Sequence, residues 1–66
     1  MDEDSVERRA QALEQRIHRI AQDLATDTGK PLEFWLVEVA KIVTMGAPWR
    51  LVDGPGGPRI IVKLPP

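Results

Sequence analysis

The side chains that could perform catalysis or bind a metal are few and isolated in this chain. His18 is the only histidine, Ser5 is the only serine, and there is no cysteine. A nucleophilic site needs a base within hydrogen-bond reach of Ser or Cys, and zinc sites need several His or Cys ligands. We therefore expect His18 to be a solvated helix residue and Ser5 to help a helix start. We expect no catalytic residues, no metal site, no cofactor and no enzymatic activity.

Two further patterns are weak as chemical signals. Asp23 and Asp27 share one helix face, but carboxylates that act as an acid/base pair need a pocket that gives them different environments. Gly29-Lys30 resembles the end of a phosphate-binding loop, yet the upstream glycine and the preceding strand are missing. We interpret Gly29 as a helix stop. The Gly/Pro-rich residues 54–58 are expected to reverse the chain, and exposed loop tips of this kind can also bind.

Three cations near the C-terminus are the best candidates for contact with nucleic acid or a protein partner. Arg50, Arg59 and Lys63 are expected on one face of a two-stranded ribbon, and such ribbons can enter a major groove of DNA. The alternative is an ordinary solvated sheet face, because Lys and Arg commonly protect edge strands from aggregation.

The three aromatic residues are expected to anchor the fold or a dimer contact. Phe34 and Trp35 are neighbours in sequence, so on a helix their side chains diverge by roughly 100° and at least one must face away from the first helix. This favours an intersubunit contact. The predicted dimer interface consists of Phe34, Trp35, Val39, Ile42 and Trp49.

Composition limits the class of protein. A chain of 66 residues forms one small domain, here residues 1–66, and domains of this size are marginally stable. Without disulfides or a metal, oligomerisation is the remaining way to add stability. A net charge of −1 argues against coating nucleic acid or an anionic membrane through bulk charge. With no signal-like or membrane-spanning segment, we expect a cytoplasmic protein that does not contact membranes.

The first helix is predicted over residues 4–27. Its apolar residues are spaced 4, 3, 4, 3, 4, the heptad pattern of one narrow seam that another helix must cover. In a parallel dimer, Arg9 of one chain is placed to pair with Glu14 of the other, although exposed pairs contribute only about 0–1 kcal/mol. The seam residues are Val6, Ala10, Leu13, Ile17, Ile20 and Leu24.

The second helix is predicted over residues 31–45, between Pro31 and Gly46. A strand is the alternative, because several residues are β-branched, but an uninterrupted length of about 14 residues favours a helix. Most of its circumference is apolar, so it should be covered on more than one side. The short connection to the first helix makes the two helices antiparallel neighbours.

Residues 49–64 are predicted to form a β-hairpin around a Gly/Pro-rich turn. If Val52 faces Arg59, then Leu51 faces Ile60, and one face of the ribbon is wholly apolar. That face includes Trp49, Leu51, Ile60, Val62 and Leu64. A two-stranded ribbon is only marginally stable by itself, so it must pack on the helices or extend the sheet of a partner.

These elements predict an α+β fold: an antiparallel two-helix hairpin followed by a C-terminal β-hairpin, in a small and dimeric domain. The dimer is expected to use the second helix and the apolar parts of the first. Elimination favours a small non-enzymatic homodimer that acts as a protein-interaction or regulatory module, with another protein as its further partner. One alternative is a nucleic-acid-binding transcriptional regulator that uses the basic hairpin face. A second is a small-ligand binder or enzyme with a site between subunits, lined by Trp35 or Trp49.

Overall fold

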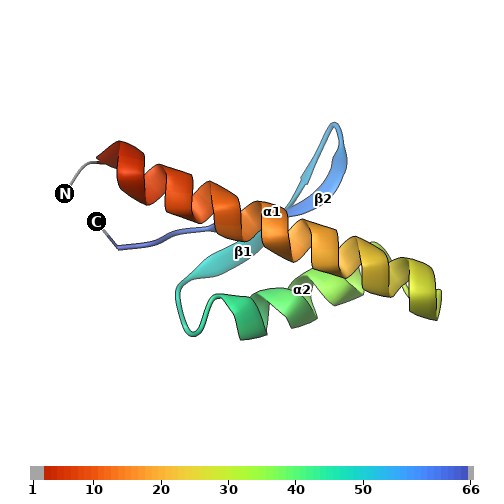
Figure 1. Ribbon diagram of the computed structural model, residues 1–66. Helices are drawn as coiled ribbons and strands as arrows, with labels where there is room; N and C mark the ends of the chain where they lie inside the picture. The colour runs from red at the N-terminus through yellow and green to blue at the C-terminus, as the bar shows by residue number, and fades with distance from the viewer. Residues whose placement is uncertain (1–2, 66) are drawn as a thin grey trace.

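The chain forms two helices followed by a two-stranded antiparallel sheet, in the order that the sequence predicts. The computed structural model describes residues 3–65 (Figure 1). The predicted α+β class, the helical hairpin and the C-terminal β-hairpin are confirmed. The elements are α1 (Glu3–Thr28), α2 (Leu32–Val43), β1 (Trp49–Gly54) and β2 (Gly57–Val62).

One side of α1 is covered by α2 and β2, and the middle of the apolar seam packs against the core of the chain itself. Ile17 and Ala21 have no exposed surface, whereas Ile20 is 37% exposed. The heptad prediction is therefore wrong at Ile20. Ile20 lies three residues after Ile17 and Ala21 four residues after it, so the two lie on either side of Ile17 around the helix. The side that contains Ala21 is the one that α2 and β2 cover.

Thr28 and Gly29 end α1 and turn the chain towards α2. Gly29 has a φ of 76°, in the left-handed region, and its N–H donates to the Ala25 carbonyl at 2.9 Å. The Thr28 hydroxyl donates to the Leu24 carbonyl at 2.8 Å and accepts the indole N–H of Trp35 at 2.9 Å. The predicted helix stop at Gly29 is confirmed, and Thr28 joins the end of α1 to the first turns of α2.

The second helix ends two residues earlier than predicted. Thr44 is its C-cap, with the hydroxyl donating to the Ala40 carbonyl at 2.7 Å. Met45 and Gly46 then both have positive φ, 53° and 95°. The helix cannot continue through a residue in this conformation, so Met45 lies in the turn that leads to β1.

The hairpin has the predicted register. Val52 is paired with Arg59, Leu51 with Ile60 and Trp49 with Val62. The face towards the helices contains the buried side chains of Ile60 and Val62, and the other apolar residues of this face pack against the same core. Within residues 5–65, the apolar residues of the core are Ile17, Ala21, Leu36, Val39, Ala40, Ile60 and Val62.

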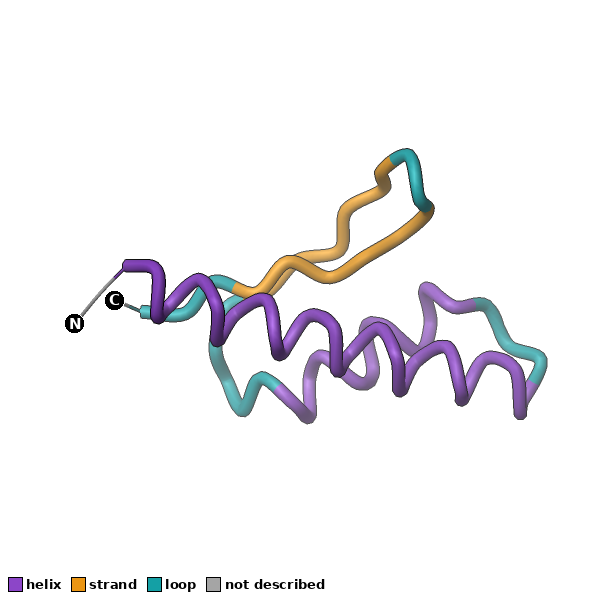
Figure 2. The backbone as a smooth tube through the Cα atoms, turned by 45° about the horizontal axis from the view of Figure 1, so that its top comes forward, coloured by secondary structure: helices purple, strands orange, loops and turns teal. Residues whose placement is uncertain are grey.

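The hairpin is attached to α1 through β2. Because the Lys63 N–H donates to the Pro48 carbonyl at 2.9 Å, the N–H of Val62 points away from β1. That N–H donates to the Glu14 carboxylate of α1, at 2.9 Å from Oε2. The turn of the hairpin extends away from the helices (Figure 2). The Glu14 carboxylate, which a parallel dimer could pair with Arg9 of the other chain, is bonded within its own chain.

Candidate interaction surfaces

The outer face of the hairpin contains the three predicted cations. Arg50, Arg59 and Lys63 are all exposed, and the register places Arg50 opposite Ile61 and Arg59 opposite Val52. Within residues 5–65, no carboxylate lies within salt-bridge distance of any of the three. The structure therefore brings the three predicted contact residues together on one solvated, positively charged face, with two half-buried β-branched side chains between them.

The five residues predicted for a dimer interface are divided between core and surface. Val39 is 6% exposed in the core of its own chain, and Trp35 and Trp49 are half-buried against that core. Phe34 is 42% exposed and Ile42 is 76% exposed. A second copy seated on α2 would thus touch Phe34 and Ile42, whereas Val39 already holds the chain's own elements together.

An aromatic and cationic cluster lies at the start of α2. The ring of Phe34 packs edge to face against that of Trp35, with centroids 5.0 Å apart. The ammonium of Lys30 lies 4.7 Å from the centroid of the Phe34 ring. Such a cation–π contact is worth about 0.5–1 kcal/mol at an exposed site. The cluster holds the Phe34 ring in place while part of it remains open to solvent.

Met45 was predicted to be the last residue of the second helix, but it lies in the turn after α2 and is 90% exposed. A residue with a side chain is uncommon in the left-handed region, where it costs about 1–2 kcal/mol relative to ordinary backbone conformations. The sequence signal was present: Met45 directly precedes Gly46, and helices commonly end with a left-handed residue. The signal did not reveal that the positive φ begins at Met45 and not at Gly46.

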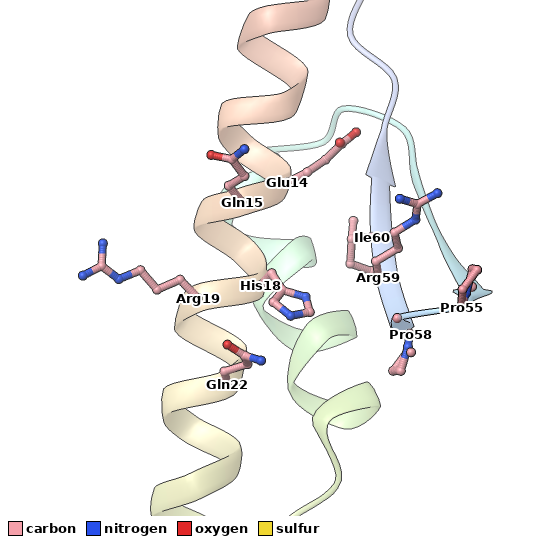
Figure 3. Close-up of a pocket in the computed structure, with 12 residues that line it drawn as sticks. Glu14, Gln15, His18, Arg19, Gln22, Pro55, Pro58, Arg59 and Ile60 are labelled. Atoms are coloured by element: carbon pink, nitrogen blue, oxygen red, sulfur yellow. The ribbon is translucent and has the colours of Figure 1, made fainter.

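A cleft of about 420 Å³ separates α1 from the turn of the hairpin (Figure 3). His18 lies on the α1 side of this cleft and is half-buried, so it is less solvated than predicted. Figure 3 shows its ring directed towards β2, whereas Arg19 points away from the hairpin. The cleft is lined by Glu14, Gln15, His18, Arg19 and Gln22 of α1 and by residues 54–60. It lies within one chain and includes neither tryptophan.

The described residues contain no group of three or more His, Cys, Asp or Glu side chains that could hold a metal ion. No helix within residues 3–65 is both long enough and apolar enough to span a membrane. In comparisons with known proteins, no protein-family model, no curated protein and no solved structure matches the chain.

Proposed function

We propose that the protein is a small, non-enzymatic homodimer that acts as a protein-interaction or regulatory module in the cytoplasm. The observation that supports this most is the exposed apolar surface of α2 and the turn after it. Phe34, Ile42 and Met45 are 42%, 76% and 90% exposed on a chain whose core is small. Large apolar side chains exposed along one element are found at protein-interaction sites. The lack of cysteine agrees with a reducing compartment.

Sedimentation velocity over a concentration series tests the dimer. We expect a reversible monomer–dimer equilibrium, because the interface of one short helix belongs to the small interfaces that bury less than about 1,200 Å² in total. A species that remains monomeric up to millimolar concentration would contradict the proposed homodimer.

The second candidate function is nucleic-acid binding through the basic hairpin face. It is favoured by one specific observation: Arg50, Arg59 and Lys63 share an exposed face and have no acidic partner within residues 5–65. If each cation neutralises one phosphate, the logarithm of the binding constant should fall with the logarithm of salt concentration with a slope of about −2.7.

Fluorescence anisotropy with a generic DNA duplex measures this slope. Replacement of the three cations by alanine should abolish the binding, while Lys30→Ala and Lys41→Ala together should leave it almost unchanged. Binding that is absent, or that does not weaken as salt is raised, would refute this candidate and leave the interaction module as the remaining proposal.

A further inference from the structure

A second apolar and charged row runs along the solvent side of α2. Phe34, Glu38 and Lys41 are spaced 4 and 3 residues apart, so they lie on one face of α2, and Met45 follows in the turn just beyond the end of the helix. All four are open to solvent: the exposed fractions of the Glu38 and Lys41 side chains are 43% and 60%. The row has the spacing of a helix–helix seam, and no element of residues 3–65 covers it.

If the row of one copy is laid against the same row of a second copy in reverse order, each residue meets a residue of complementary type. Apolar residues occupy both ends, and a negative and a positive residue occupy the middle. If a second copy lies antiparallel, with a two-fold axis level with the midpoint between residues 39 and 40, Glu38 faces Lys41 of the partner subunit. The same operation brings Phe34 level with the turn that contains Met45 of the partner subunit. Each contact then occurs twice, as a two-fold interface requires.

The charges select this orientation. In a parallel pair, Glu38 would face its own counterpart and Lys41 would face its own counterpart, so both middle contacts would be repulsive. In the antiparallel pair, both are attractive, and the Glu38–Lys41 ion pair within each chain, at 3.7 Å, holds these side chains beside the axis. Like charges placed opposite one another are a common way of excluding the wrong pairing.

The two ends of the row supply the apolar contact. Met45 is held in a left-handed backbone conformation, with a φ of 53°, and the residue is 90% exposed. Methionine sulfur packs favourably on aromatic rings, and the exposed part of Phe34 is such a ring. Ile42, which is 76% exposed, flanks the row, and in the antiparallel pair it lies on the same side as its own counterpart.

We propose that a second copy of this chain docks on the solvent side of α2 in antiparallel orientation, pairing Glu38 with Lys41 and Phe34 with Met45 across a two-fold axis. This inference rests on the homodimer proposed above and specifies its interface.

Charge reversal tests the pairing directly. Glu38→Lys gives a chain with two lysines in the row, and Lys41→Glu gives a chain with two glutamates. Each variant alone should dimerise at least about tenfold more weakly, because both middle contacts become repulsive. A mixture of the two should form a heterodimer with affinity near that of the wild type, because every middle contact is then Lys to Glu. The like charges at positions 38 and 41 of each variant still repel one another in the mixture. Only contact between the two chains can therefore explain a recovery of dimer affinity.

The measurement is sedimentation velocity, with native mass spectrometry of one isotope-labelled variant to identify heterodimers. Glu33→Lys and Arg19→Glu are the matched controls, because they make the same charge changes at exposed positions away from the row. Circular dichroism checks that every variant retains its helices. A wild-type dimer with no heterodimer preference in the mixture would overturn this interface but leave the proposed homodimer intact. A monomeric wild type would overturn both.

Replacement of Met45 tests the apolar end separately. Met45→Gly removes the side chain and suits the left-handed backbone, so it should preserve or raise stability while weakening the dimer several-fold. Met45→Leu keeps an apolar side chain and should retain most of the affinity. If the wild type, Met45→Gly and Met45→Leu dimerise equally well, the contact between Phe34 and Met45 is contradicted.

Discussion

Replacement of Glu14 should weaken the attachment of the hairpin to α1. The Glu14 carboxylate accepts the Val62 N–H at 2.9 Å, and Val62 is 4% exposed. Hydrogen bonds to charged groups contribute about 1.5–3 kcal/mol, and a buried donor left without a partner costs a similar amount. Glu14 is only half-buried, so we expect Glu14→Ala to lower the free energy of unfolding by about 2 kcal/mol. For a domain of this size, that corresponds to a fall in Tm of roughly 8–16 °C.

The assay is thermal and urea unfolding followed by circular dichroism, at one fixed and low protein concentration so that dimer formation does not contribute. Glu14→Gln keeps an oxygen acceptor without the charge, and neutral hydrogen bonds are about half as strong as charged ones. It should therefore cost about 1 kcal/mol. Asp23→Ala removes an exposed carboxylate from the same helix and should change stability by less than about 0.5 kcal/mol.

Hydrogen exchange locates the effect. The Val62 amide should lose protection in Glu14→Ala by more than the amides of α2 do, because its acceptor is gone. If Glu14→Ala is as mild as Asp23→Ala, or if Glu14→Gln is the more damaging of the two Glu14 variants, the bond does not hold the hairpin in place and the reasoning is refuted.

Three other substitutions test the helical hairpin by the same unfolding assay. Leu36 has no exposed surface, so Leu36→Ala should cost about 2–5 kcal/mol, and a loss below 1 kcal/mol would mean that α2 is not packed as described. Gly29 has a φ of 76° and open space around the position of a Cβ. Gly29→Ala should therefore lower the free energy of unfolding by about 1–2 kcal/mol through backbone strain alone. An unchanged Tm would contradict the left-handed turn. Thr28→Val removes the acceptor of the Trp35 indole N–H, which should cost about 0.5–1.5 kcal/mol and shift Trp35 fluorescence, whereas unaltered fluorescence would argue against that hydrogen bond.

The succession of elements was readable from the sequence because its signals are local. Helical periodicity, the glycine after α1 and the turn residues of the hairpin each act over a few neighbouring positions. The two-residue alternation of strands also fixed the pairing of Val52 with Arg59, and with it the placement of all three cations on the outer face. The shared face of the three cations was therefore predicted from the sequence, and the register confirms it.

The tertiary structure decided which side of each helix is covered, and this distinction determines the candidate interface. Val39 and Ile42 are similar residues three positions apart on α2, yet one is in the core and the other is 76% exposed. Ala21 replaces Ile20 in the core for the same reason: burial depends on where α2 and β2 lie, not on the residue itself. The bond from Glu14 to Val62 joins residues 48 positions apart, a separation at which local sequence patterns carry no information.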